Sequence, residues 1–252
     1  MSRRTRQVII AVAVTLAFGG LIAFSCADEA SAPSPTSSIT TDASHAAPAT
    51  RASVGLPPPS LDGPVSLEKA VHQRRSVREY THAPVTLADV SQLLWAAQGI
   101  TSSQGGRAAP SAGGTYPLEI YVAAGKVTGL EAGVYHYLPQ QHALAPVKSG
   151  DLRRDLQEAS HDQTWVGAAP VVFVIGAVYE RTTKRYGDRG VRYVHLEAGH
   201  AAQNLCLQAT ALGLGAVTVG AFTDERIQEL LDLPTQVKPL YVIPLGHPKS
   251  DS

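Results

Sequence analysis

The chain has 252 residues, with 21 basic and 21 acidic side chains and a formal net charge of zero. This length suits one domain of ordinary size with extensions, and the neutral balance gives no electrostatic support for binding to nucleic acid. The two cysteines, Cys26 and Cys206, cannot form a disulfide framework.

Residues 1–26 have the features of an export signal. An arginine-rich start precedes an apolar run from Val8 to Phe24, and Ser25-Cys26 follows. Such an order is typical of a secretory signal. Cys26 at this junction resembles the lipid attachment site of bacterial lipoproteins, whereas an uncleaved membrane span would use the same apolar run. We therefore expect an exported protein, anchored on the outer face of the cytoplasmic membrane by a lipid or by a single N-terminal span.

Residues 27–63 are dominated by Ala, Ser, Thr and Pro and include Pro57-Pro58-Pro59. Such a segment has too little apolar surface to offset the entropy that is lost on ordering. The composition predicts a disordered tether between the leader and a globular domain over residues 64–252.

Two helices are expected at the start of the domain. Val65–Arg75 offers a modest apolar face. Thr86 is a favourable cap for a second helix that ends at Gly99, and this helix places apolar residues at i, i+3, i+4 and i+7: Val90, Leu93, Leu94 and Ala97.

The stretch Arg107–Ala123 combines a turn with a strand. Pro110–Gly114 is a run of turn-forming residues, and the alternating pattern Leu118–Val122 follows it. Small residues and glycines allow backbone N–H groups to approach a flat or anionic ligand. A tight turn explains the same glycines without any ligand, so this stretch alone does not establish a site.

The remaining pattern intermixes strands and helices. In chain order we expect a hairpin of Gly133–Leu138 and His142–Val147, a helix over Asp151–Ser160, a strand buried on both faces over Pro170–Val178, a long helix over Tyr193–Leu212, a helix after Thr223 and a final strand over Leu240–Leu245. These elements do not repeat the regular crossover units of a doubly wound sheet, which favours an α+β fold.

Arg74, Arg75, Ser76 and Arg78 place three guanidinium groups and one hydroxyl within five residues, at the end of the first helix. The planar fork of arginine suits bidentate binding of phosphate, and a serine hydroxyl adds a short hydrogen bond. A solvated basic helix end, which the helix dipole favours, explains the same residues.

Three motifs in this order, Arg74–Arg78, Pro110–Glu119 and Gly213–Phe222, resemble the FMN-dependent nitroreductase superfamily. The closest resemblance is to its SagB-type branch, which includes azoline-oxidising dehydrogenases, and it covers roughly Val65–Lys249. It implies an α+β fold in three α/β/α layers, with a mixed, mainly antiparallel sheet flanked by helices. It also implies an intertwined homodimer with FMN at the subunit interface.

The resemblance assigns residues to the cofactor. Arg74 and Ser76 would lie near the FMN phosphate with Arg75 at the same end, and Arg78 would lie near N1 and O2 of the ring, where a cation stabilises reduced flavin. The other implied contacts are Pro110, Ser111, Ala112 and Gly113, often from the partner subunit, the Gly220 and Ala221 N–H groups facing N5 and O4, and also Val219 and Gly246.

Two positions depart from relatives of this kind. Gly114 stands where many classical nitroreductases have asparagine, as is common in the SagB-type branch. Arg185, before Tyr186, stands where azoline oxidases tend to have a lysine. Arginine hardly deprotonates and cannot act as a general base near neutral pH, and Lys184 could replace it only after a shift of one residue. Lys184, Tyr186 and Tyr116 therefore remain the candidates for a catalytic role, and azoline oxidation is disfavoured.

Glu197 and His200 are spaced at i and i+3 on the long helix, as a metal pair would be. No further cluster completes such a site, so we expect no metal and a structural or flavin-edge role for the pair. Cys206 lies in the apolar stripe of the same helix and is expected to be an inert core thiol.

The sequence thus predicts an exported FMN-dependent oxidoreductase that transfers hydride or electrons to or from a small organic substrate, with an unidentified electron donor or acceptor. The alternatives are a non-catalytic flavin- or ligand-binding lipoprotein and a peptide azoline dehydrogenase. The expected partners are a second copy of the chain and the membrane, the latter through the leader or a lipid.

Overall fold

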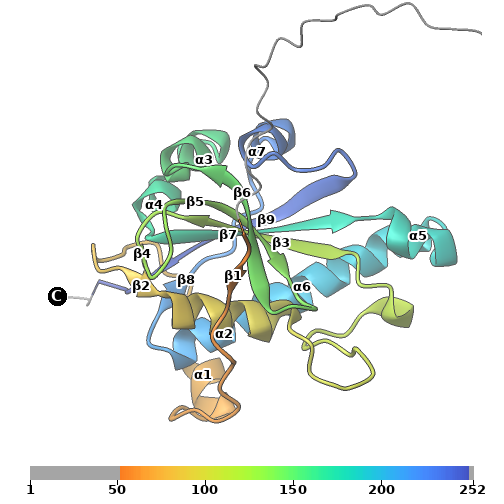
Figure 1. Ribbon diagram of the computed structural model, residues 1–252, viewed down its shortest axis with the longest axis horizontal. Coiled ribbons are helices and arrows are strands. Elements are labelled where there is room, and N and C mark those ends of the chain that lie inside the picture. Colours follow the sequence, from red (N-terminus) through yellow and green to blue (C-terminus); the bar gives the residue numbers. More distant parts are fainter. Residues whose placement is uncertain (1–51, 250–252) are drawn as a thin grey trace, which may run out of the picture. The chain divides into compact units, whose positions relative to one another are not determined.

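A seven-stranded sheet runs through the part of the chain that the computed structural model describes, residues 52–249 (Figure 1). Its strand order is β1-β6-β5-β3-β7-β9-β8, and every pairing within it is antiparallel. The strands are β1 Val54–Gly55, β3 Leu118–Ala124, β5 Gly133–Leu138, β6 Ala143–Ser149, β7 Val171–Val178, β8 Gly215–Ala216 and β9 Val237–Gly246. A separate parallel pair joins β2 Val85–Thr86 to β4 Val127–Thr128.

The helices cover both faces of this sheet. They are α1 Leu67–Gln73, α2 Leu87–Gln98, α3 Arg153–Ala159, α4 Thr164–Ala168, α5 Glu180–Tyr186, α6 Arg189–Ala211 and α7 Asp224–Leu230, with a short 3-10 turn η1 at Ala112–Gly114. In Figure 1, α1, α2 and α6 lie on one side of the sheet and α3, α4 and α7 on the other. The predicted three-layer α+β fold with a mainly antiparallel sheet is confirmed.

The core follows from the alternation of side chains along β3 and β7. Ile120 and Phe173 pack on the side of α2 and α6, whereas Tyr121 and Val174 pack on the side of α3, α4 and α7. Residues 171–177 of β7 are buried, because this strand lies between β3 and β9 and carries a helix layer on each face. The prediction of a strand buried on both faces is confirmed.

The ends of α2 and α6 show what local sequence does and does not determine. The predicted cap of α2 is a full capping box, since Thr86 Oγ1 accepts from the Asp89 N–H at 3.1 Å and Asp89 Oδ2 accepts from the Thr86 N–H at 2.9 Å. In contrast, α6 begins at Arg189, earlier than predicted, directly after the break that Gly187 makes at φ 55°. The preceding helix α5 was not predicted, because its sequence ERTTKRY has no apolar periodicity.

The segment before α1 is part of the described structure. Val54 and Gly55 pair with β6, and the Ser60 N–H donates to Gln92 Oε1 at 2.8 Å. The structured region therefore begins before residue 64, where the sequence predicted its start. The composition did not predict the structure of this segment, because its contacts are mostly backbone hydrogen bonds, which do not need apolar side chains. The predicted leader, Cys26 and the first part of the tether lie outside the described residues.

Among residues 52–249, no helix combines the length and the apolar character that crossing a bilayer requires.

Candidate functional site

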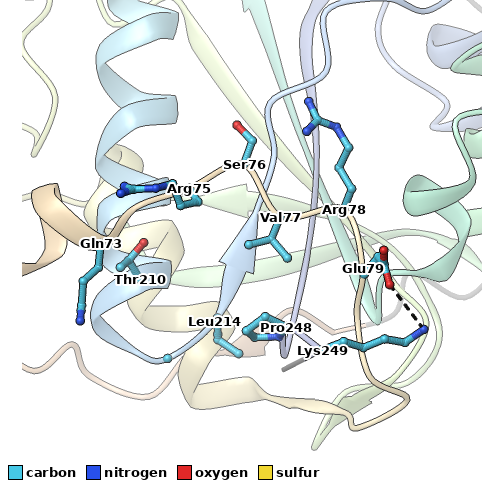
Figure 2. A pocket seen from close by; sticks show the side chains of 11 residues that line it. Gln73, Arg75, Ser76, Val77, Arg78, Glu79, Thr210, Leu214, Pro248 and Lys249 are labelled. Atoms are coloured by element: carbon cyan, nitrogen blue, oxygen red, sulfur yellow. Dashed lines mark ion pairs between the residues drawn. The ribbon is translucent and has the colours of Figure 1, made fainter. Parts of the chain in front are cut away.

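The arginine-rich stretch leaves α1 and runs beside β8. Ser76 forms an isolated parallel bridge with Ala216, and the Val77 N–H donates to the Ala216 carbonyl at 3.0 Å. Successive side chains of such an extended stretch alternate in direction. Figure 2 shows this alternation, with Ser76 and Arg78 on one side and Val77 pointing the other way, toward Leu214.

A cavity of about 710 Å³ opens along this stretch, and we call it the cationic cavity. Its lining combines basic, polar and apolar groups: Gln73, Arg75, Ser76, Val77, Arg78, Glu79, Thr210, Gly213, Leu214, Pro248 and Lys249. The antiparallel pairing of Gly215 with Gly246 brings Pro248 and Lys249 to this place. The sequence prediction missed Thr210, Leu214 and Lys249, because nothing in their local sequence indicates that β8 pairs with β9.

The basic side chains of this stretch have different surroundings. Arg75 Nη1 donates to the carbonyls of His72 and Arg74, at 2.8 and 2.9 Å, so it closes the end of α1 as a basic helix end would. The Arg78 guanidinium lies 5.5 Å from the Trp165 ring centroid. Lys249 Nζ lies 4.0 Å from a carboxylate oxygen of Glu79 (Figure 2). Arg78 is therefore the least committed cation of the cavity.

Two side chains assigned to the phosphate differ in position. Ser76 lines the cavity, and its hydroxyl has no hydrogen-bond partner among residues 52–249, so it is free to donate. Arg74 does not line the cavity. Its charge acts instead on Cys206 of α6, whose thiol pKa is raised to about 11 by burial and is lowered only in part by Arg74. The buried thiol is thus protonated near neutral pH, as expected for an inert core cysteine.

The cationic cavity fits an anionic group of the size of a phosphate. The lining contains three cations, Arg75, Arg78 and Lys249, and one carboxylate, that of Glu79, so it has an excess of positive charge. A serine hydroxyl and a guanidinium that project from the same side of an extended strand can both donate to phosphate oxygens. Ser76 and Arg78 are the residues that could hold such a group.

A second predicted region, Pro110–Tyr116, forms a turn that we call the glycine turn. Gly113 and Gly114 have φ values of 60° and 65°, which favour glycine. A Cβ atom on Gly113 would lie 2.5 Å from Tyr186 Oη and 2.8 Å from Arg185 Nη1. Arg185 Nη1 also donates to the Gly113 carbonyl at 3.1 Å. The backbone conformation therefore favours glycine at position 113, and a Cβ atom there would displace the ends of the Tyr186 and Arg185 side chains.

Of the candidates for catalysis, Tyr116 and Tyr186 lie at the glycine turn, together with Arg185, and Lys184 does not. Lys184 is exposed on α5, and within the described part of the chain its ammonium group has no ion pair or hydrogen bond. Tyr116 closes the turn with φ 45°, and its ring lies 4.6 Å below the Arg107 guanidinium. Lys184 therefore does not take the place of the lysine that azoline oxidases tend to have at the position of Arg185.

Behind the glycine turn lies a buried polar cluster that the sequence indicated only in part. Arg107 Nη1 donates to Gln98 Oε1 at 2.8 Å, and Ser111 Oγ accepts from the Tyr116 N–H at 2.9 Å. Glu197 of α6 is 2% exposed and borders this cluster. No group of three or more His, Cys, Asp or Glu side chains in residues 52–249 could hold a metal ion. The groups that act on Glu197 are therefore polar and basic side chains at the glycine turn, Ser111, Arg107 and Gln98.

The third predicted region, Val219–Ala221, presents backbone rather than side chains. Val219 is buried and exchanges backbone hydrogen bonds of 2.8 and 3.0 Å with Val242. Gly220 is exposed, and a Cβ atom there would meet nothing within 4 Å. The N–H groups of Gly220 and Ala221 donate to no acceptor among the described residues, so they are available to a ligand. Gly246 differs, since a Cβ atom there would lie 2.5 Å from Pro170 Cδ, and packing explains this glycine.

Two of these regions are neighbours and one is remote. The Trp165 ring contacts Arg78, and Gln163 Nε2 just before it donates to the Ala221 carbonyl at 2.9 Å, so the start of α4 links Val219–Ala221 to the cationic cavity. The glycine turn lies elsewhere, near α5. In Figure 1, the yellow-green η1 is on the right of the sheet, whereas the stretch after α1 runs on the left beside β8. One chain therefore does not bring Ser111–Gly113 to Ser76 and Arg78.

Comparison with known proteins gives one consistent match. Residues 71–247 match the model of the nitroreductase family. The chain is 48% identical over 182 residues to MJ1384 of Methanocaldococcus jannaschii, described as a nitroreductase, covering 72% of this chain and 91% of that protein. It is 26% identical over 198 residues to the FMN reductase (NAD(P)H) of Bacillus subtilis, covering 73% and 66%.

A solved structure gives a further likeness. In the Escherichia coli microcin synthetase McbBCD complex with truncated pro-MccB17 bound, one chain superposes with a TM-score of 0.61 and 25% identity, covering 76% of each chain.

Proposed function

The chain belongs to the nitroreductase family, and from that premise we propose that it is an FMN-dependent oxidoreductase acting on a small organic substrate. The observation that carries this proposal is the cationic cavity, in which Ser76 and Arg78 project from the same side of one strand (Figure 2). The similarity to a flavin reductase supports it independently. Bound FMN would supply the hydride or electron transfer.

In this proposal the protein binds and orients the cofactor. Ser76 donates a hydrogen bond to the phosphate, and the Arg78 guanidinium, which projects from the same side of the strand, adds a charged donor to it. The motif resemblance would instead place Arg78 near the flavin ring. The free Gly220 and Ala221 N–H groups hold acceptor atoms of the ring without a side chain that would cover its face. Arg74 contributes from a distance, as its position beside Cys206 indicates.

The site requires a second copy of the chain. The glycine turn is remote from the cationic cavity within one chain, and the motif resemblance assigns both to the same flavin. We therefore propose a homodimer in which the turn of each subunit completes the cavity of the other. Leu67 and Val71 on α1 and Leu196 on α6 are exposed by 65, 56 and 52%, which supplies apolar surface for such an interface.

A visible spectrum with redox titration tests the function. The purified protein should show flavin absorbance that NADH, NADPH or dithionite bleaches and that an added quinone or nitro compound restores. Flavin that is bound but never turns over would indicate the non-catalytic alternative. Absence of flavin, with failure to take up added FMN, would refute the proposal.

A peptide azoline dehydrogenase is a second candidate, supported by the likeness to a chain of the microcin synthetase complex. Arg185 argues against it, because its guanidinium is hydrogen-bonded to the Gly113 carbonyl where a lysine base would be needed. We infer a small-molecule oxidoreductase rather than a peptide-modifying one. Turnover of an azoline-containing peptide by the purified protein would reverse this preference.

The proposed location is the outer face of the cytoplasmic membrane. The support is the basic and apolar leader that ends at Cys26. Replacing the lipid-accepting thiol, Cys26→Ser, should release the protein from the membrane fraction if a lipid is the anchor. Continued membrane binding of this variant, with Val8–Phe24 intact, would indicate a spanning anchor instead.

A further inference from the structure

Two unpaired polar atoms lie together behind the glycine turn. Within residues 52–249, four buried side-chain nitrogen or oxygen atoms have no hydrogen-bond partner: Gln98 Nε2, Ser160 Oγ, Trp165 Nε1 and Glu197 Oε1. Gln98 and Glu197 are 1% and 2% exposed, and both belong to the polar cluster beside Ser111. Gln98 and Ser111 are nevertheless close enough to Glu197 for hydrogen bonding to lower its pKa, so this carboxyl is buried among polar neighbours with which it forms no hydrogen bond of good geometry. Such a weakly satisfied buried group can change its partners at little cost.

The groups that face Glu197 come from three other parts of the chain. Gln98 ends α2, Arg107 lies on the following loop, and Ser111 begins the glycine turn. Arg107 is the charged group that acts on Glu197, and Arg107 in turn interacts with Glu119 of β3 and Arg181 of α5. Burial raises the pKa of Glu197 to about 7, against the opposing effects of Ser111, Arg107 and Gln98. Near neutral pH this carboxyl is therefore present in both forms.

The Ser111 hydroxyl has one proton to donate and two lone pairs to accept with. One lone pair is used by the Tyr116 N–H at 2.9 Å. An ionised Glu197 can only accept, so it draws the Ser111 proton inward. A protonated Glu197 can donate to the second lone pair of Ser111, which leaves the Ser111 proton free on the open side of the turn.

We propose that Glu197 is a positioning residue whose protonation decides whether the Ser111 hydroxyl donates inward to the carboxylate or outward to a bound ligand. The inference rests on the proposed function, because the outward ligand is the flavin that the glycine turn would contact, through an acceptor atom of its ring. No proton passes to the flavin. Glu197 takes up one proton from solvent when the outward hydrogen bond forms.

This arrangement couples flavin affinity to pH with a defined sign. The outward hydrogen bond is present while Glu197 is protonated and is lost as the pH rises through its pKa. The FMN phosphate itself ionises with a pKa of about 6, so the effect of Glu197 is defined against a variant that cannot ionise. The ratio of the FMN affinities of the wild type and of Glu197→Gln should fall by about threefold to tenfold between about pH 6 and about pH 8.5, as expected for one hydrogen bond. By the same linkage, FMN binding to the wild type should take up more protons than FMN binding to Glu197→Gln.

Fluorescence titration of the full-length apoprotein with FMN, repeated over this pH range, tests the inference with two variants. Glu197→Gln cannot ionise and keeps a donor, so its affinity should equal that of the wild type at about pH 6 and exceed it at about pH 8.5. Ser111→Ala has no hydroxyl, so its affinity should be lower than that of the wild type at about pH 6 and equal to it at about pH 8.5. Glu225→Gln, an exposed acid on α7, is the charge-matched control and should behave as the wild type.

A spectroscopic readout separates this role from a merely structural one. The infrared band of a protonated carboxyl should increase when FMN binds to the wild type and be missing from the difference spectrum of Glu197→Gln. A pH profile of FMN affinity in either Glu197→Gln or Ser111→Ala that runs parallel to the wild-type profile would overturn the inference while leaving the proposed function intact. If Glu197→Gln does not fold, Ser111→Ala decides alone. Failure of the wild type to bind FMN at any pH would refute the proposed function itself.

Discussion

The cationic cavity and the glycine turn are built in opposite ways. Ser76 and Arg78 are exposed side chains with few partners in the described chain, and the cavity offers charge on an exposed surface. The turn is held by hydrogen bonds from the side chains of α5. Arg185 donates to the Gly113 carbonyl, and Arg181 donates to the Tyr116 carbonyl at 3.1 Å. Thr115 Oγ1 and Thr182 Oγ1 share a further hydrogen bond of 2.8 Å. One region thus supplies electrostatic attraction and the other a fixed shape.

This difference predicts how each region responds to mutation. Changes in the cationic cavity should weaken the ligand without affecting the fold, because the side chains stabilise little in the empty protein. Changes in the glycine turn should destabilise the fold first and the ligand site as a consequence.

Arg78→Ala should give the largest effect on the ligand. Loss of a charge-assisted contact to an anion costs about 2 kcal/mol, or about 30-fold in FMN affinity. The melting temperature of the apoprotein should change little, because within residues 52–249 the exposed guanidinium contacts the Trp165 ring and forms no hydrogen bond or ion pair. Titration calorimetry with FMN measures the affinity, and Arg154→Ala, an exposed arginine on α3, is the control. Equal affinities for Arg78→Ala and wild type would remove Arg78 from the site.

Gly113→Ala should give the largest effect on stability. The positive φ costs about 1 kcal/mol, and displacement of the Tyr186 and Arg185 side-chain ends adds to this, for about 2 kcal/mol in all. Gly114→Ala is a matched control, because its φ of 65° is equally unfavourable but its nearest atom is 3.9 Å away, so about 1 kcal/mol is expected. Denaturant unfolding of both variants measures the difference. Equal destabilisation would show that the packing of Tyr186 against the turn does not matter.

Glu119→Gln should give the smallest effect, a change in the pH dependence of stability that appears only at acidic pH. Burial raises the pKa of this carboxyl, but the hydrogen bond from His136 at 2.6 Å and the charge of Arg181 outweigh burial and hold the pKa below its usual value. A lowered pKa in the folded state means that its stabilisation is complete above the unfolded pKa and is lost as the pH falls through the folded pKa.

Between about pH 6 and about pH 3 the wild type should therefore lose about 1 kcal/mol more stability than Glu119→Gln. Because Arg181 also holds the Tyr116 carbonyl, the turn should loosen over the same range. Urea unfolding at several pH values measures this difference. Parallel pH profiles of the two proteins would show that the Glu119 ion pair does not stabilise the fold.

The sequence predicted those features whose causes are local. The capping box at Thr86 and the buried strand around Val174 depend on neighbouring residues, and both are present. The site was indicated by its motifs. It remained incomplete where distant segments meet: Lys249 reaches the cavity through the β8–β9 pairing, and Glu197 reaches Arg107 through the packing of α6. Such contacts depend on tertiary structure and leave no local pattern.

The same limit applies to α5 and to residues 52–63. The helix α5 lacks an apolar stripe because its role is to hold the glycine turn through polar side chains. The segment around Pro57 has a composition typical of disorder, yet Ser91 Oγ donates to the Pro57 carbonyl at 2.6 Å. In both cases polar hydrogen bonds, rather than apolar burial, determine the structure, and sequence periodicity does not report them.

Subunit complementation tests most directly whether the cationic cavity of one chain and the glycine turn of another form one flavin site. Arg78→Ala and Gly113→Val are purified separately, then dissociated and reassociated as a mixture, at an FMN concentration that saturates the wild type but leaves each variant largely empty. A mixed dimer has one intact site, so random mixing should restore about a quarter of the wild-type flavin content. No gain in bound flavin over the separate variants, although mixed dimers form, would contradict a site shared between subunits.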